Sequence, residues 1–216
     1  MIQAVIFDFD GVLNNFPEVI WRERRKLLET EYKVRLTPED LEHLLGLTLD
    51  DQVAYIGKKY PIKLTKEELI KHRESVKHIL ETEAKLMPGV QSLLRELKRA
   101  KIKRVIASNK TRILLEEDLE KLKIRDSFDL ILAREDANKP KPNPEIFLKA
   151  AKRLNVPRNE CVVIEDALHG IKGAKKAGMY AVGVCSPFHS SFKHADLTVR
   201  SMKELTLKKI RSLAKK

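Results

Sequence analysis

Two aspartates stand one residue apart at the end of the first apolar run of the chain. Asp8 and Asp10 follow AVIF, so both carboxylates are placed where a buried strand is expected to end. Two like charges at such a place repel each other unless a cation or a lysine compensates them. Carboxylate oxygens are ligands that Mg²⁺ prefers. The pair therefore predicts a Mg²⁺ site that water and a phosphate group would complete.

Three further groups of polar residues follow apolar runs, and ligands of open parallel sheets bind at the carboxyl ends of the strands. The groups are Ser108 with Asn109, Lys139 with Lys141, and Glu165 with Asp166. We expect them to meet the aspartate pair at one edge of a sheet.

Some of these residues also have a purely structural interpretation. Asp166 and Ser108 suit the N-caps of the helices that follow them, and the segment PKPNP is typical of a stiff turn with a solvated lysine. An EF-hand loop starting at Asp8 is excluded because Val12 and Val19 occupy two of its ligand positions. No P-loop or dinucleotide-binding motif follows any of the apolar runs.

The elements that must position these residues follow an alternating pattern from residue 88 onward. Five short aliphatic runs without polar alternation indicate parallel strands covered on both faces: 2–7, 103–108, 128–133, 161–166 and 180–185. Helical patterns separate the later runs, which predicts an α/β fold with a doubly wound parallel sheet.

Residues 16–83 lack this rhythm and are expected to be helical. Thr37 before Pro38 predicts a helix start, and Thr65 with Glu68 predicts a capping box. We therefore expect a catalytic α/β core of residues 1–15 and 84–216, with residues 16–83 as an inserted helical cap domain.

Composition limits the classes of partner. The 216 residues carry a net charge of +12, but much of the excess lies in helices of mixed sign, and no aromatic-rich basic stripe accompanies it. Nucleic acid is not expected as the main partner. No apolar stretch is long enough to predict a membrane span, and the two cysteines form no disulfide framework. We expect a monomeric cytoplasmic protein that binds a small phosphorylated molecule.

Four segments in order resemble motifs of the haloacid dehalogenase superfamily of phosphotransferases. They are DFDGVL at 8–13, ASN at 107–109, KPNPEIF at 141–147 and VVIEDALHGIKGAKKAGM at 162–179. A helical insert after the first motif resembles the branch that contains beta-phosphoglucomutase and phosphoglycolate phosphatase. The fold expected from the residues alone, a Rossmann-like core with a cap, agrees with this resemblance.

The resemblance implies a role for each acidic residue. Asp8 would attack phosphorus and become a phosphoaspartate, while Asp10 would act as general acid and then as general base. Asp8, the main-chain carbonyl of Asp10 and Asp166 would hold Mg²⁺. Glu165 would orient a water bound to the metal.

The resemblance also implies the phosphate-binding groups. Ser108 and the backbone of Asn109 would bind phosphate oxygens, and Lys141 would neutralise charge in the transition state. Lys141 is preferred to Lys139 because it directly precedes the PNPEIF pattern. Lys110 is interpreted as a solvated lysine.

This sequence differs from the beta-phosphoglucomutase branch at positions that bear on the type of reaction. The mutase resemblance calls for a histidine near Ile20, and its absence argues against a phosphomutase. Trp21 either lines the site or packs in a core, and the turn ending at Thr48 either faces the substrate or ends a helix. The basic residues of this part, Arg22, Arg24 and Arg25, are interpreted as a solvated helix face, and His169 as a surface residue.

The sequence thus predicts a phosphoric monoester hydrolase. It would be a Mg²⁺-dependent phosphatase of a sugar phosphate or of phosphoglycolate, acting through a phosphoaspartate. The alternatives are a phosphomutase of the beta-phosphoglucomutase type and a non-catalytic binding protein on the same fold.

Overall fold

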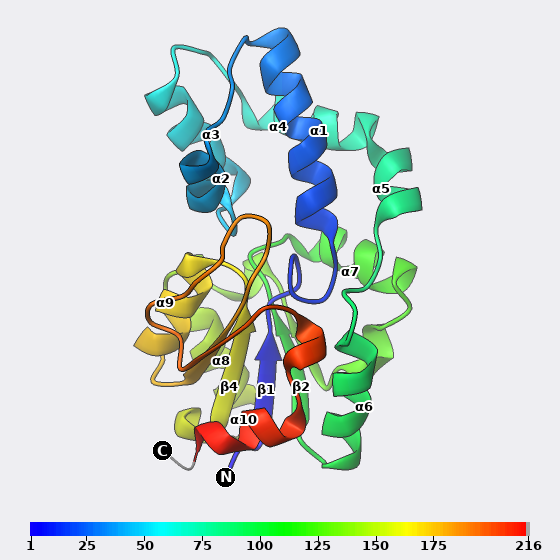
Figure 1. The fold of residues 1–216 in the computed structure, drawn as a ribbon, viewed down its shortest axis with the longest axis vertical. Coiled ribbons are helices and arrows are strands. Elements are labelled where there is room, and N and C mark those ends of the chain that lie inside the picture. Colours follow the sequence, from blue (N-terminus) through cyan, green and yellow to red (C-terminus); the bar gives the residue numbers. More distant parts are fainter. Residues whose placement is uncertain (215–216) are drawn as a thin grey trace.

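The computed structural model describes residues 1–214, in which a six-stranded parallel sheet lies at the centre (Figure 1). The strands are β1 (Ala4–Phe7), β2 (Lys103–Ala107), β3 (Leu130–Leu132), β4 (Cys161–Glu165), β5 (Tyr180–Val184) and β6 (Leu197–Val199). Their order in the sheet is β3-β2-β1-β4-β5-β6, and every pair is parallel. The strands β2 and β3 lie on one side of β1, and β4, β5 and β6 lie on its other side. The strand order therefore reverses between β1 and β4, and ligands of doubly wound folds bind at such a point.

Helices cover both faces of the sheet because β1 is apolar on both sides. Val5 and Phe7 pack with α6 (Val90–Arg99), α7 (Arg112–Lys121) and α10 (Leu207–Leu213). Ala4 and Ile6 pack with α8 (Glu145–Leu154) and α9 (Leu168–Lys176). All four side chains are fully buried, as expected for a strand covered on both faces.

Five helices lie beyond the carboxyl ends of the strands (Figure 1). They are α1 (Phe16–Glu31), α2 (Pro38–Leu44), α3 (Leu49–Lys59), α4 (Lys66–Ser75) and α5 (Lys77–Glu83). A buried cluster that includes Leu28, Leu44, Ile56 and Leu69 of α1 to α4 is distinct from the two clusters of the sheet. The first turn of α1 and Leu80 of α5 pack with one of the sheet clusters instead. The proposal that residues 16–83 form an inserted cap domain rests on this separate cluster.

The predicted fold class is confirmed. Four of the predicted strands are one or two residues longer than the observed ones, and three differences are larger. The short strand β6 was not predicted, because its three residues include the exposed Thr198. The strand predicted over 128–133 is confined to Leu130–Leu132. The helix that follows the predicted capping box at Thr65 ends at Ser75, and Val76 separates it from α5.

Short 3₁₀ helices join several of these elements and lie at Arg125–Ser127, Arg134–Asp136, Arg158–Glu160 and Met202–Glu204. Among residues 1–214, no helix has the length and apolar character needed to span a bilayer.

Candidate active site

A cavity of about 500 Å³ separates the carboxyl ends of the strands from the helices of residues 16–83. Its lining contains all the residues predicted for catalysis, phosphate binding and metal binding: Asp8, Asp10, Ser108, Asn109, Lys141, Glu165 and Asp166. The expected convergence of these strand ends is therefore present, and the chemical role of each residue stays a prediction.

Lys141 forms the central ionic contact of the cavity. Its Nζ lies 2.6 Å from Asp8 Oδ1 and 2.6 Å from Glu165 Oε1, and the residue is 4% exposed. Burial alone would lower the pKa of Lys141, but the two carboxylates raise it above its usual value. Lys141 is therefore a permanent cation here, whereas Lys139 is exposed, which supports the choice between the two lysines.

Three carboxylates gather beside this lysine. Oxygens of Asp8, Glu165 and Asp166 all lie within 4.8 Å of one another. Burial, partly offset by Lys141, raises the pKa of Asp8 to about 7, and burial together with the charges of Glu165 and Asp8 raises that of Asp166 well above its usual value. The buried Oδ2 of Asp166 has no hydrogen-bond partner among the described residues. This excess of negative charge and the unpartnered oxygen fit a divalent cation bound by oxygen ligands.

Two glycines allow these carboxylates to sit so close to the backbone. A Cβ at Gly11 would lie 1.9 Å from Asp166 Oδ2, and the φ of +84° at Gly11 also favours glycine. A Cβ at Gly170 would lie 1.9 Å from Glu165 Oε1. The group that approaches Gly170 is therefore the side chain of Glu165.

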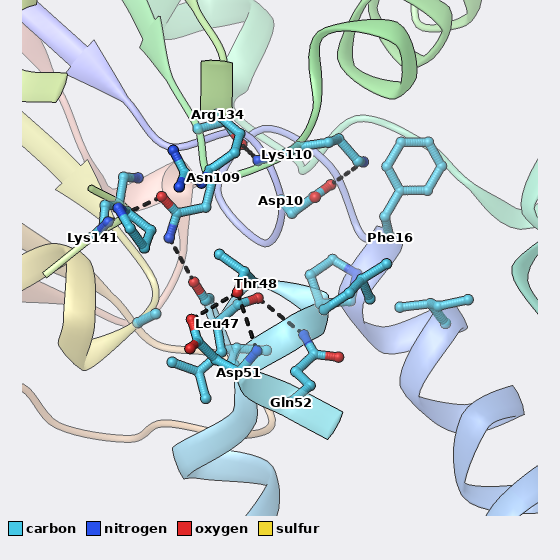
Figure 2. A pocket seen from close by; sticks show the side chains of 18 of the residues that line it. Asp10, Phe16, Leu47, Thr48, Asp51, Gln52, Asn109, Lys110, Arg134 and Lys141 are labelled. Carbon is cyan, nitrogen blue, oxygen red and sulfur yellow. Dashed lines mark hydrogen bonds and ion pairs between the residues drawn. The ribbon is translucent and has the colours of Figure 1, made fainter. Parts of the chain in front are cut away.

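The carboxylate of Asp10 points toward Lys110 (Figure 2). Lys110 Nζ lies 2.9 Å from Asp10 Oδ1, forms a second ion pair with Asp118, and lies 5.0 Å and 4.7 Å from the ring centres of Phe9 and Phe16. The Lys110 side chain is only 9% exposed. The interpretation of Lys110 as solvated was wrong, because two carboxylates and two aromatic rings replace water around it.

Ser108 and Asn109 connect the strand end to its surroundings. Ser108 Oγ accepts a hydrogen bond from the backbone N–H of Lys110 at 3.1 Å, and the N-cap of α7 is Thr111, so Ser108 does not cap that helix. Asn109 Oδ1 accepts from the backbone N–H of Lys141 at 3.1 Å, and Asn109 Nδ2 donates to the carbonyl of Gly46 at 3.0 Å (Figure 2). Asn109 therefore fixes the loop of Lys141 and the turn before α3.

Asp166 does not cap the helix that follows it either. The N-cap of α9 is Ala167, and the Asp166 carboxylate is buried with the two other acids. Of the two interpretations of Asp166, the arrangement favours the cation site.

The helical side of the cavity resolves several alternatives. Trp21 is buried in the hydrophobic cluster of the helices and also lines the cavity, so both interpretations of this residue hold. Thr48 also lines the cavity, and it is the N-cap of α3, where its hydroxyl accepts from the backbone N–H of Asp51. Arg22 is exposed and paired with Glu83, as predicted.

Two basic or imidazole side chains differ from their predicted exposure. Arg24 is 4% exposed and lines the cavity, so its assignment to a solvated face was wrong. His169 is partly buried, and its Nε2 lies 3.3 Å from the carbonyl of His43. Of the polar residues that sequence reasoning missed in this region, only Lys110 had a local signal, its place directly after Asn109.

A family profile described as haloacid dehalogenase-like hydrolase matches residues 5–184. The chain belongs to this family. The beta-phosphoglucomutase of Bacillus subtilis is 32% identical over 217 residues, covering 95% of this chain and 92% of the relative. The phosphorylated carbohydrates phosphatase of Thermotoga maritima is 30% identical over 179 residues, covering 82% of each chain.

A solved structure agrees with these relatives. CbbY from Rhodobacter sphaeroides in complex with phosphate superposes with a TM-score of 0.80 at 27% identity, covering 98% of this chain and 100% of that one. The predicted superfamily is confirmed. The predicted class of enzyme, a phosphoric monoester hydrolase, agrees with the family description and with the relatives named as phosphatases.

Proposed function

We propose that this haloacid dehalogenase-like hydrolase is a Mg²⁺-dependent phosphatase of a small phosphorylated metabolite, of the sugar phosphate or phosphoglycolate class. The observation that carries the proposal is the buried contact of Lys141 with both Asp8 and Glu165 beside the unpartnered oxygen of Asp166. The relative named for phosphorylated carbohydrates and the phosphate complex of CbbY support the substrate class.

Asp8, Asp166 and the main-chain carbonyl of Asp10 would hold Mg²⁺, and Glu165 would orient a water beside it. Bound Mg²⁺ would offset the charge of the phosphoryl oxygens, so that an anionic nucleophile can approach an anionic substrate. Asp8 and Asp166 have raised pKa values in the protein alone, as expected for carboxylates that lack this compensating charge.

In the first half of the reaction, an Asp8 oxygen attacks phosphorus and the ester P–O bond breaks. Asp10 donates its proton to the departing oxygen, which leaves as an alcohol. Lys141 lowers the pKa that burial alone would give Asp8 and so favours the ionised form that attacks. Ser108 and the Asn109 backbone bind phosphoryl oxygens during the transfer.

In the second half, water attacks the phosphorus of phosphorylated Asp8, and Asp10 accepts the proton of that water. The bond between Asp8 and phosphorus breaks, phosphate leaves and the carboxylate is restored. Lys110 holds the Asp10 carboxylate at a fixed place through the contact at 2.9 Å. The helices of residues 16–83 cover the cavity and limit the access of bulk water.

A phosphomutase is the second candidate, favoured by the similarity to the Bacillus subtilis beta-phosphoglucomutase. Such an enzyme transfers the phosphoryl group of Asp8 back to a sugar hydroxyl. The branch is expected to carry a histidine at or next to position 20, where Ile20 lines the cavity and offers no group for proton transfer. This residue favours the phosphatase.

Phosphate release from a panel of phosphorylated metabolites, with and without Mg²⁺, tests the proposal on the wild type and Asp8→Asn. We expect Mg²⁺-dependent release by the wild type and none by the variant, with circular dichroism showing that the variant is folded. Equal release by the two proteins would overturn the proposal. Conversion of a hexose 1-phosphate into its isomer without net phosphate release would favour the mutase.

A further inference from the structure

Arg24, on α1, is a buried cation in the wall of the same cavity. Its side chain lines the cavity together with Trp21, Gln52, Leu69 and Arg73, and it is 4% exposed. Its guanidinium donates to Gln52 Oε1 from Nη1 at 2.6 Å and lies 4.9 Å from the ring centre of Trp21. Both partners are neutral, so neither supplies a counter-charge.

The guanidinium of Arg24 is incompletely satisfied among the described residues. Its buried Nε has no hydrogen-bond partner, and no salt bridge reaches the group. Burial and the nearby charge of Arg73 lower the pKa of Arg24 to about 10. A cation of this kind is destabilising in the empty protein unless something of opposite charge is bound beside it.

Neighbouring acids are already engaged. Asp118 lies 3.4 Å from Arg73 Nη2 and also pairs with Lys110, which in turn contacts Asp10. Arg73 and Lys110 thus use the charges of Asp118 and Asp10, and the positive charge of Arg24 is left in excess.

The two acids of α3 that line the cavity do not remove this excess. Asp50 pairs with Lys66 at 2.8 Å, and Asp51 accepts the hydroxyl hydrogen bond of Thr48 at 2.7 Å. The positive charge of Arg24 is thus left facing the cavity on its helical side.

We propose that Arg24 and Arg73 bind a second anionic group of the substrate, a carboxylate or a second phosphate remote from the phosphoryl group that is transferred. Two guanidinium forks match the paired oxygens of either group. This inference rests on the proposed phosphatase function. It narrows the class of substrate to phosphate esters with an anionic group at both ends.

Matched esters test this specificity. Alkanediol monophosphates, alkanediol bisphosphates and phosphooxy carboxylates of equal chain length, in a series of lengths, differ only in the distal group. We expect kcat/KM of the wild type for one anionic series to exceed kcat/KM for the neutral series by about tenfold or more. In Arg24→Met, the ratio of these two kcat/KM values should fall by at least about tenfold, mainly through a higher KM for the anionic esters. The better anionic series distinguishes a carboxylate from a second phosphate.

Arg22→Met is the matched control, since Arg22 lies on the same helix but is exposed and paired with Glu83. It should leave the ratio of the two kcat/KM values as in the wild type. Equal kcat/KM of the wild type for anionic and neutral esters would overturn the inference, and so would an unchanged ratio in Arg24→Met.

Binding separates this inference from the proposed function. Calorimetric titration with an alkane diphosphonate and with the alkyl monophosphonate of equal length, both with Mg²⁺, needs no turnover. We expect tighter binding of the diphosphonate to the wild type and loss of that difference in Arg24→Met. If no ester is hydrolysed, the proposed function fails, and equal binding of both phosphonates would overturn the subsite as well.

Thermal unfolding distinguishes a binding role from a structural one. Removal of a buried cation that has no carboxylate partner should leave Tm of Arg24→Met equal to or above that of the wild type. A large drop in Tm, repeated in Arg24→Gln, would show that Arg24 serves packing, and would contradict the inference.

Discussion

Burial gives the charged side chains at the centre of the cavity their chemistry. Asp8, Glu165 and Lys141 form one buried unit in which the lysine is permanently charged and the two acids are held within hydrogen-bond distance of it. Such an arrangement fixes the direction of the Asp8 carboxylate before any substrate arrives. Electrostatic preorganisation of this kind accounts for a large share of the rate enhancement of many enzymes.

Replacement of Lys141 should therefore affect both stability and catalysis. In Lys141→Met, Asp8 and Glu165 stay buried without their counter-charge, so we expect the free energy of unfolding to fall by about 3–5 kcal/mol. We also expect kcat to fall by about 100-fold or more. Urea denaturation and phosphate release measure the two effects.

The control for Lys141 is Lys139→Met, since Lys139 is an exposed lysine of the same segment. Its change in stability should stay within about 0.5 kcal/mol. Without the lysine the pKa of Asp8 rises further, so Lys141→Met should regain stability as pH is lowered and Asp8 becomes protonated. Equal stability of the two variants at neutral pH would contradict the account of Lys141.

At the scale of elements, one buried carboxylate joins α2 to α3. Asp40 accepts hydrogen bonds from the backbone N–H of Thr37 at 2.8 Å and from Tyr55, Lys59 and Tyr60 at 2.8, 2.5 and 2.5 Å. Burial alone would raise the pKa of Asp40, but these donors, Lys59 first, lower it well below its usual range. Asp40 thus stabilises the helices that form one wall of the cavity.

Asp40→Asn should lower the free energy of unfolding by about 2–4 kcal/mol at neutral pH, because an amide cannot accept all of these bonds. A carboxyl with a lowered folded pKa stabilises above its unfolded pKa of about 3.9 and loses that contribution as pH falls through the folded value. The difference from the wild type should therefore shrink in acid.

Urea denaturation over a range of pH measures this effect, with Glu39→Gln, an exposed acid of the same helix, as the control. A penalty in Asp40→Asn that is the same at neutral and acid pH would show that the charge of Asp40 is not what stabilises the pair of helices.

Local signals in the sequence were sufficient for most elements and for the principal residues of the cavity. The helix start at Thr37 and the capping box at Thr65 are formed as residue types within a few positions predict. The positions of Asp8, Lys141 and Asp166 in the cavity were predicted because each of them follows a strand of a parallel sheet, at the edge where ligands bind.

Burial that depends on distant packing could not be predicted in this way. Lys110 is enclosed by Phe16 of α1 and by Asp118 of α7, and Arg24 is enclosed by Gln52 of α3. Apart from the place of Lys110 directly after Asn109, nothing within a helical turn of either cation distinguishes it from a solvated one. The strand β6 escaped for a similar reason, since only its place beside β5 defines it.

For the whole molecule, the strand order brings residues from distant parts of the sequence to one edge of the sheet. Asp8 and Glu165 lie at the same edge of the sheet because β1 and β4 are neighbours. Their carboxylates form the candidate Mg²⁺ site together with that of Asp166. A cation bound only by the folded chain stabilises it by mass action.

Mg²⁺ should therefore raise the thermal unfolding temperature of the wild type, by an amount equivalent to about 2.7 kcal/mol at a hundredfold excess over Kd, and a chelator should reverse the rise. The increase should be reduced or absent in Asp166→Asn, and it should persist in Asp51→Asn, whose acid lines the cavity outside the carboxylate cluster. Differential scanning calorimetry measures the shift. Equal Mg²⁺ shifts in the two variants would place the cation elsewhere.

Trapping of the covalent phosphoenzyme tests the central claim most directly. The wild type would be mixed with p-nitrophenyl phosphate and Mg²⁺, quenched in acid during the first turnover and reduced with borohydride, which converts a phosphoaspartate to homoserine. We predict homoserine at position 8 by peptide mass spectrometry, and none there in Asp8→Asn. Modification of another residue, or phosphate release by the wild type with no modified residue at position 8, would contradict nucleophilic attack by Asp8.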